Sequence, residues 1–296
     1  MKSYIVNTSQ EIRLDRYIRR IIPNITQGVI EKSLRGAKIL VNGKKAKSNL
    51  RLIDEDKVEI AHNLLDEENE VKKLYSSAVI SLADKLLGSY LIFKCKHFIA
   101  IDKPCGLAVQ GGSKINLSID DALSYMNQSQ TEKYKLVHRL DKNTSGILLI
   151  AIGYENARIL GDAFKNKKIN KTYHAVLCGV LSRKHGVISN KISKNDKEYE
   201  IVDVNEDGLI AETEYTLLRT NQEYSLVEFK PKTGRTHQLR VHSKFLSCPI
   251  LGDVKYGGKK YARMMLHASN INISESIFGK SYNITSEMPS EFNAAV

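Results

Sequence analysis

Residues 61–75 of this 296-residue chain are rich in charge and have no helical or strand periodicity, and the sequence pattern differs on their two sides. Before them lies a short basic segment with two helical patterns and a hairpin signal, and after them strand and helix patterns alternate. A charged stretch without periodicity is typical of a linker, and a chain of this length usually forms about two domains. The sequence therefore predicts a small module over residues 1–62, a linker over 63–85 and a larger domain over 86–296.

The small module is predicted to begin with two short helices. Apolar residues recur at helical spacing from Leu14 onward, and Pro23 ends the first helix because its ring cannot continue the hydrogen-bond ladder. Asn24 or Thr26 can cap a second helix, and Gly36 can end it.

A hairpin is predicted after the second helix. The dipeptide Asn42-Gly43 separates short strand patterns over residues 38–41 and 44–46, and it suits the positive φ angles of a type I′ turn. A strand near residues 58–60 would complete a small α/β module.

The larger domain is predicted to have an α+β fold, with a mixed, mainly antiparallel sheet and flanking helices. The expected strands cover residues 90–101, 146–152, 171–179, 210–218, 224–229 and 266–273, and the expected helices cover residues 118–126, 154–167 and 236–245.

Positive charge is concentrated in the small module. The chain carries 45 Lys and Arg against 33 Asp and Glu, a formal charge of +12, which favours polyanionic partners. Between Arg13 and Arg51 there are eleven basic residues against only Asp15 and Glu31. This concentration is typical of a nucleic-acid-binding module, although a solvated helix face would also be basic.

Several classes of protein are disfavoured by the sequence. The longest apolar run, residues 147–152, is far shorter than the ~18 residues needed to cross a bilayer. The polar residues 1–11 lack the apolar core of a signal peptide, so we expect a cytoplasmic protein without membrane contact. The four cysteines are widely separated and are expected to be buried free thiols rather than a disulfide framework.

Residues 138–146, HRLDKNTSG, lie immediately before an apolar strand pattern. A loop at a strand end can present side chains over a cleft, so Asp141 is a candidate for chemistry. An isolated Asp in a loop more commonly caps a turn. Here the neighbouring basic residues would keep the carboxylate ionised, and this context favours a chemical role.

Residues 232–242, KTGRTHQLRVH, run from a glycine turn into a helix start, where free amides and cations favour anions. Arg235 and Arg240 would diverge around a helix, so one could hold a phosphate while the other meets a carboxylate. An ordinary basic surface helix is the alternative. His237 and His242 diverge likewise, and they lack the Cys or acidic residues that would complete a metal site.

Residues 171–173, KTY, open a strand pattern. An aromatic residue at such a position usually belongs to the core, so Tyr173 alone does not indicate chemistry.

In their order and approximate spacing, these three segments resemble the signature segments of the RluA-type pseudouridine synthases. Residues 101–112 resemble the family's segment before the catalytic loop, and residues 249–257 and 266–268 resemble its C-terminal segments. Residues 11–60 resemble the small RNA-binding module of ribosomal small-subunit protein four. Together these segments cover most of the chain, and the HRLDxxTSG signature is highly specific.

The resemblance implies a role for individual residues. It makes Asp141 the catalytic aspartate, Tyr173 the aromatic that packs on the target base, and Arg240 its basic partner, while Arg139 fills the gap left by the flipped uridine. The expected RNA-binding residues are Arg13, Arg16, Arg35, Lys44, Lys45, Arg139, Arg235 and His237.

Three departures from the family pattern fall outside the proposed catalytic side chains. Cys105 replaces a small residue, Asn143 stands where Asp is common, and residues 272–296 match loosely.

The resemblance also implies the function. The chain would convert specific uridines of large-subunit ribosomal RNA, its expected partner, to pseudouridine by base flipping, as a monomer and without a cofactor or metal. One alternative is a synthase that acts on transfer RNA or on another ribosomal site. Another is a non-catalytic RNA-binding assembly factor, against which the retained Asp141, Tyr173 and Arg240 argue.

Overall fold

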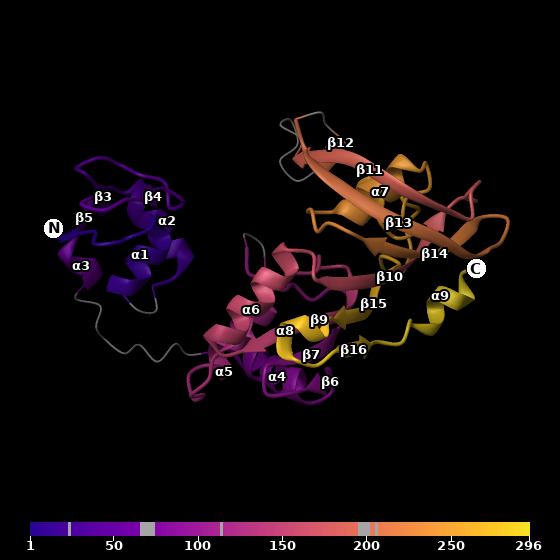
Figure 1. Ribbon diagram of the computed structural model, residues 1–296, viewed down its shortest axis with the longest axis horizontal. Helices are drawn as coiled ribbons and strands as arrows, with labels where there is room; N and C mark the ends of the chain where they lie inside the picture. The colour runs from indigo at the N-terminus through magenta and orange to yellow at the C-terminus, as the bar shows by residue number, and fades with distance from the viewer. Residues whose placement is uncertain (23–24, 66–74, 113–114, 195–201, 205–206) are drawn as a thin grey trace. The chain divides into compact units, whose positions relative to one another are not determined.

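The computed structural model describes residues 1–22, 25–65, 75–112, 115–194, 202–204 and 207–296. The chain forms two compact units, Met1–Leu74 and Tyr75–Val296, which Figure 1 shows in indigo and in violet to yellow. Pro23, Asn24 and the part of the predicted linker over residues 66–74 lie outside the described residues. The larger unit begins at Tyr75, whereas the sequence predicted that it would begin at residue 86.

The N-terminal unit packs short helices against small sheets. Its strands and helices are β1 (Lys2–Ile5), β2 (Ile12–Arg13), α1 (Leu14–Ile21), α2 (Gln27–Arg35), β3 (Ile39–Val41), β4 (Arg51–Leu52), β5 (Lys57–Ile60) and α3 (His62–Leu65). Strand β5 pairs antiparallel with β1 and β3, and β2 pairs with β4. A separate apolar core fills this unit, built around buried residues such as Ile18, Ile30 and Leu52.

Local signals in this unit act largely as the sequence predicts. Thr26 caps α2, and its side chain accepts a hydrogen bond from the backbone N–H of Val29. Asn42 and Gly43 have φ angles of 49° and 74°, as a type I′ turn requires. Beyond the turn, however, only Lys44 bridges to β3, because the basic segment there offers no apolar face to bury.

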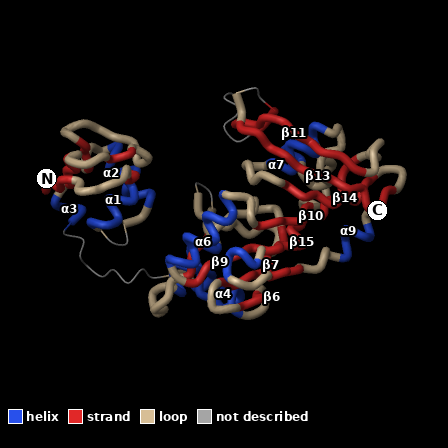
Figure 2. The backbone as a smooth tube through the Cα atoms, viewed as in Figure 1, coloured by secondary structure: helices blue, strands red, loops and turns tan. Residues whose placement is uncertain are grey.

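The larger unit is built on one sheet of eleven described strands (Figure 2). The strands are β6 (Leu91–Lys94), β7 (Phe98–Lys103), β8 (Tyr134–Leu136), β9 (Ser145–Ile152), β10 (Ile169–Cys178), β11 (His185–Lys194), β12 (Val202–Val204), β13 (Leu209–Thr220), β14 (Tyr224–Pro231), β15 (Leu266–Ile273) and β16 (Tyr282–Thr285). The order is β12-β11-β13-β14-β10-β15-β9-β7-β6, with β16 beside β15 and β8 beside β9. All of these pairs are antiparallel except β9 with β15, so the predicted mixed, mainly antiparallel sheet is confirmed.

Helices cover both faces of the sheet at strand β9. The helices of the unit are α4 (Ser77–Leu87), α5 (Ile119–Met126), α6 (Tyr154–Lys165), α7 (Gln238–Phe245), α8 (Glu275–Phe278) and α9 (Ser290–Ala294), with a 3-10 turn η1 (Val254–Tyr256). Leu148 and Ile150 pack with α4 and α5, whereas Ile147 and Leu149 pack with α6. All eight residues of β9 are buried, so the strand holds the loop before it in a fixed position.

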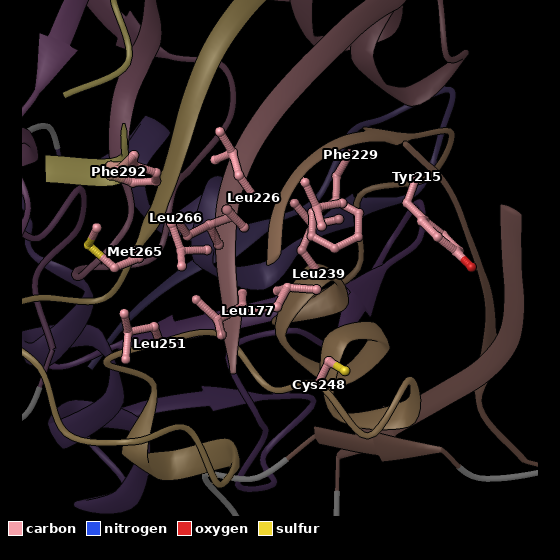
Figure 3. Packing of buried hydrophobic residues seen from close by; sticks show 14 of the residues in the cluster. Leu177, Tyr215, Leu226, Phe229, Leu239, Cys248, Leu251, Met265, Leu266 and Phe292 are labelled. Carbon is pink, nitrogen blue, oxygen red and sulfur yellow. The ribbon is translucent and has the colours of Figure 1, made fainter. Parts of the chain in front are cut away.

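A further apolar cluster joins α7 and α9 to β10, β13 and β14. Figure 3 shows part of it, including Leu177, Phe229 and Leu239. Each fully buried side chain of this kind contributes roughly 1.5–3 kcal/mol. This cluster fixes α7, which carries part of the second predicted motif.

Two sequence expectations are wrong in this unit, and several strands, among them β11, were missed. The predicted linker over residues 63–85 contains most of α4, because Ser76 caps a helix whose Leu82 and Leu86 are buried in the core. The predicted strand over residues 90–101 is a hairpin of β6 and β7.

Two other expectations concern the whole chain. All four cysteines are free, but only Cys248 is buried, whereas Cys95, Cys105 and Cys178 are partly exposed. In the part of the chain that the structure describes, no helix is long and apolar enough to span a membrane.

Candidate active site

The three motifs singled out in the sequence meet in one cleft of the larger unit, with a volume of about 510 Å³. Its walls come from the loop before β9, from the start of β10, from the end of α6, and from the turn that leads into α7. The lining residues include Arg139, Asp141, Lys171, Tyr173, Arg235, His237 and Arg240. The fold therefore gathers all three predicted catalytic residues at one place.

Strand pairing explains how the first and third motifs meet. Gly146 of β9 and Tyr173 of β10 are both register partners of Ala268 in β15. The HRLDKNTSG loop thus ends directly across β15 from the KTY segment. Gly146 has φ 103°, and a Cβ there would lie 2.2 Å from the carbonyl oxygen of Ala268, so the glycine of the signature allows the two backbones to approach.

A buried lysine holds the loop that carries Asp141. The Nζ atom of Lys103 donates hydrogen bonds to the carbonyl oxygens of Pro104, Leu107 and Lys142, at 2.9, 2.9 and 3.0 Å. Its burial lowers the pKa of Lys103 to about 8. Sequence reasoning missed this role, although Lys103 lies in the segment that carried the resemblance before the catalytic loop.

Asp141 faces two basic side chains. Its Oδ2 atom accepts a hydrogen bond from Nη1 of Arg240 at 3.2 Å and lies 3.7 Å from Nε2 of His237. The Asp141 side chain is 20% exposed, so its carboxylate is held by protein on one side and open to the cleft on another. The turn hydrogen bond from the Thr144 amide goes to the backbone carbonyl of Asp141, whereas its carboxylate accepts from Arg240.

Arg240 is shared between two carboxylates. Its Nε and Nη2 atoms donate to Asp253 at 2.7 and 2.8 Å, and this bidentate pair leaves Nη1 for Asp141. Burial lowers the pKa of Arg240, but the bonds to Asp253 and then Asp141 outweigh it and raise the pKa. A buried cation requires such partners. Asp253 was noted only as part of a C-terminal resemblance, and its contact with Arg240 was not predicted.

His237 and Tyr256 complete the surroundings of Arg240. His237 has a left-handed backbone with φ 55°, and its Nδ1 atom lies 2.7 Å from the Tyr256 hydroxyl. The ring of Tyr256 lies under the Arg240 guanidinium at 4.7 Å, a favourable cation–π geometry. Burial lowers the pKa of His237 to about 4, so its imidazole is neutral at pH 7.

Tyr173 lies in the wall of the same cleft. Its ring is partly buried and touches two of the apolar clusters. Burial and then the negative charge of Asp141 raise the pKa of Tyr173. The hydroxyl therefore stays protonated at neutral pH, where it can donate a proton or a hydrogen bond but cannot serve as a base.

Arg235 and Arg240 have different partners, as expected, but the reason is not that they diverge around one helix. Helix α7 begins at Gln238, so Arg235 precedes the helix. The Gln238 side chain accepts hydrogen bonds from the Arg235 amide and the Thr233 hydroxyl, and this holds the turn. Arg235 itself is exposed and donates through Nε to the carbonyl of Ile210.

The remaining predicted RNA contacts divide between the two units. Arg139 is exposed in the cleft. In the N-terminal unit, Arg16, Arg35, Lys44 and Lys45 are exposed. Arg13 is different, because its guanidinium forms a bidentate pair with the buried carboxylate of Asp15. Arg13 is therefore less free to meet a phosphate than the sequence suggested.

Among the described residues, no group of three or more His, Cys, Asp or Glu side chains is placed to hold a metal ion. His242, the second histidine of the motif, is buried away from His237 and has its Nδ1 atom 2.9 Å from the Thr213 hydroxyl.

Comparison with known proteins identifies relatives over nearly the whole chain. The family described as RNA pseudouridylate synthase matches residues 97–244. Ribosomal large subunit pseudouridine synthase C of Rickettsia bellii is 48% identical over 297 residues, 97% of this chain and 98% of the relative. The protein of the same name from Vibrio cholerae is 30% identical over 293 residues, 96% of this chain and 92% of the relative.

A solved structure agrees with these sequence matches. Human RNA pseudouridylate synthase domain containing 4 has a TM-score of 0.62 and 27% identity, and the alignment covers 73% of this chain and 94% of the human chain. The predicted family and its large-subunit branch, usually called RluC, are thereby confirmed. With the HRLD, KTY and KTGRTHQLR segments assembled in one cleft, the chain belongs to the RNA pseudouridylate synthase family, in its RluA type, and is an RNA pseudouridine synthase.

Proposed function

We propose that this protein converts specific uridines of large-subunit ribosomal RNA to pseudouridine, with Asp141 as the catalytic carboxylate. The observation that carries the proposal is the pair of Asp141 and Arg240, which meet at 3.2 Å in a cleft also lined by Tyr173. The choice of RNA rests on the relatives of 48% and 30% identity, which are named ribosomal large subunit pseudouridine synthase C.

The proposed chemistry needs a carboxylate beside the sugar. Pseudouridine formation breaks the C–N glycosidic bond, turns the uracil and forms a C–C bond, without net oxidation or reduction. Breaking the C–N bond builds positive character on the sugar, as in glycoside hydrolysis. A carboxylate at that point can stabilise the charge, add to the substrate or remove a sugar proton, and Asp141 is open to the cleft for each of these roles.

Arg240 sets the position of this carboxylate. Because Asp253 holds the guanidinium from one side, the remaining Nη1 atom can orient Asp141 without swinging away. Asp253 balances part of the Arg240 charge. The contact with Arg240 therefore orients an oxygen of Asp141, while the Asp141 carboxylate keeps negative charge to present to the substrate. An orienting group of this kind is worth most in a partly dehydrated site.

Base flipping accounts for the other side chains of the cleft. Extrusion of a base from a structured RNA costs a few kcal/mol, and stacking on the Tyr173 ring can return about 1–3 kcal/mol. Arg139, exposed in the cleft, is available to occupy the space that the uridine leaves in the RNA. His237, neutral at pH 7, adds hydrogen-bonding capacity without adding charge.

The test is the variant Asp141→Asn, assayed for pseudouridine in a large-subunit ribosomal RNA transcript under single-turnover conditions. We expect loss of turnover by at least about 10³-fold with RNA affinity nearly unchanged, because a carboxylate adds no attraction for polyphosphate. Asp162→Asn is the matched control, since Asp162 is exposed on α6 outside the cleft. Substantial pseudouridine formation by Asp141→Asn would reject its catalytic role.

The RNA target needs a separate experiment. Pseudouridines mapped in all RNA from cells that lack the protein would show which sites depend on it. Loss of sites in large-subunit ribosomal RNA supports the proposal, whereas loss only in transfer RNA or at other ribosomal sites would replace the substrate but keep the chemistry. No lost site in any RNA would favour a different role.

A further inference from the structure

Lys171 lies on the cleft side of β10, two residues before Tyr173. Residues two apart on a strand share a face and are separated by about 7 Å. Both side chains line the cleft. A nucleotide whose base stacked on Tyr173 would therefore bring its backbone within reach of the Lys171 ammonium.

The Lys171 ammonium has no hydrogen bond or ion pair among the described residues. Of the other cations that line the cleft, Arg139, Lys165 and Lys167 are exposed to solvent, and the remaining three have protein partners. Lys232 pairs with Glu214 at 3.0 Å, Arg235 donates to a backbone carbonyl, and Arg240 pairs with two carboxylates. Lys171 is partly buried, and this burial lowers the pKa of its ammonium.

The protein supplies no anionic partner for Lys171 among the described residues, and the surroundings of its ammonium leave room for an anion of a ligand. A Cβ built on Gly234 would lie 3.6 Å from the Lys171 Nζ atom, so the turn before α7 passes close to the ammonium, and residue 234 places no side chain beside it. His138 is close and stays neutral, because burial and then the Lys171 charge lower its pKa to about 3, so it offers the ammonium no negative charge. Its Nε2 atom already accepts a hydrogen bond from the Leu149 amide.

We propose that Lys171 is a phosphate-binding residue of the catalytic cleft, which binds a backbone phosphate of the RNA next to the base on Tyr173, with Gly234 leaving the space for it. A partly buried cation without a partner is unfavourable in the free protein, and a phosphate oxygen relieves that cost when RNA binds. This inference rests on the proposed function only in taking RNA as the ligand that enters this cleft. It does not depend on the chemical role of Asp141.

The experiment compares the neutral variants Lys171→Met and Lys171→Gln with the charged variant Lys171→Arg, all in the full-length protein. Equilibrium binding to a large-subunit ribosomal RNA transcript is measured at several salt concentrations, alongside thermal unfolding. Each neutral variant should bind roughly tenfold more weakly or worse, and the slope of log affinity against log salt should fall by about 0.7. Thermal stability should stay the same or rise, because the unpaired charge is gone, and Lys171→Arg should restore most of the slope.

Lys94→Gln is the control, because Lys94 is exposed on β6 and outside the cleft. It should leave the affinity and slope nearly unchanged. A lower unfolding temperature with an unchanged salt slope in both neutral variants would mean that Lys171 only packs, and would overturn the proposal. This test measures binding, so its outcome can be told apart from a failure of the proposed function. In that case the parent protein itself would form no pseudouridine in the same transcript.

Discussion

The contacts of Arg240 hold much of the site together, and they do not follow from its identity in the sequence. Asp253 takes two of its donors, Tyr256 lies under its plane and Asp141 receives the third donor. A guanidinium with three fixed neighbours has little freedom to rotate, so the carboxylate that it holds is oriented before RNA arrives. The sequence motif left open whether Arg235 or Arg240 meets a carboxylate, and only the fold shows that Arg240 meets two.

Tyr173→Phe separates a chemical role of the hydroxyl from a packing role of the ring. If the hydroxyl orients the sugar or donates a proton, we expect normal folding and RNA affinity but a turnover lower by roughly 10²–10⁴-fold. Burial and then the negative charge of Asp141 raise the pKa of Tyr173, so its hydroxyl is protonated at neutral pH and can donate but does not act as a base. Single-turnover pseudouridine formation with saturating enzyme, measured beside thermal unfolding, tests this.

Tyr215→Phe is the control for that experiment, because Tyr215 is buried in the sheet outside the cleft. Its turnover should match the parent. If Tyr173→Phe also turned over like the parent, the hydroxyl would have no part in the mechanism and only the stacking role of the ring would remain. Tyr173→Leu should then still weaken capture of the flipped base.

At the scale of the elements, the site depends on two strands that meet across a third. Strand β15 pairs with β10 on one side and, in parallel, with β9 on the other. The loop with Asp141 enters β9, and Tyr173 lies near the start of β10. The parallel pair brings together segments far apart in the sequence, and Gly146 is the point at which the backbones come closest.

Gly146→Ala tests this close approach. The new Cβ would meet the Ala268 backbone oxygen at 2.2 Å on a residue with φ 103°, so either the strand pair opens or the strain is kept. We expect the free energy of unfolding to fall by about 3 kcal/mol or more, measured by urea denaturation, together with loss of activity as the Asp141 loop shifts.

The matched control is Gly161→Ala in α6, where a Cβ would meet nothing within 4 Å. This change should leave stability the same or raise it by up to about 1 kcal/mol, because Ala is the better helix former. Equal stability of the two variants would contradict the role given to Gly146.

At the scale of the whole molecule, the two units have separate apolar cores. The core around Ile18 and Ile30 contains only residues of the N-terminal unit, and the clusters of the larger unit contain none of them. A deletion in one unit should therefore leave the other folded. The exposed basic residues Arg16, Arg35, Lys44 and Lys45 belong to the N-terminal unit, whereas the residues that line the cleft with Asp141 all belong to the larger unit.

Deletion of residues 1–60 should remove affinity and targeting but keep the chemistry. Each lost phosphate contact lowers the slope of log affinity against log salt by about 0.7 for single-stranded RNA, and several of Arg16, Arg35, Lys44 and Lys45 should contribute. The slope is measured on a ribosomal RNA transcript, and residual single-turnover activity is measured at saturating protein. Asp141→Asn should keep the parent's slope, and an unchanged slope in the deletion would reject this division of labour.

The sequence by itself determined the elements whose signals are local. Strand β15, the cap of α2 and the turn at Asn42-Gly43 follow from periodicity and short-range hydrogen bonds. The HRLDKNTSG, KTY and KTGRTHQLR segments also identified the family and three residues of one cleft. Periodicity reports whether a segment buries one face, so it works without knowledge of the partner.

Only the tertiary structure decided which segments meet. Strand order, the parallel pair of β9 and β15, and the contact between Asp141 and Arg240, which are 99 residues apart, depend on the packing of the whole sheet. The same holds for Asp253, for Lys103 under the loop, and for the lack of a partner at Lys171. A side chain's partners are set by distances in space, and a pattern along the chain carries no information about them until the backbone is folded.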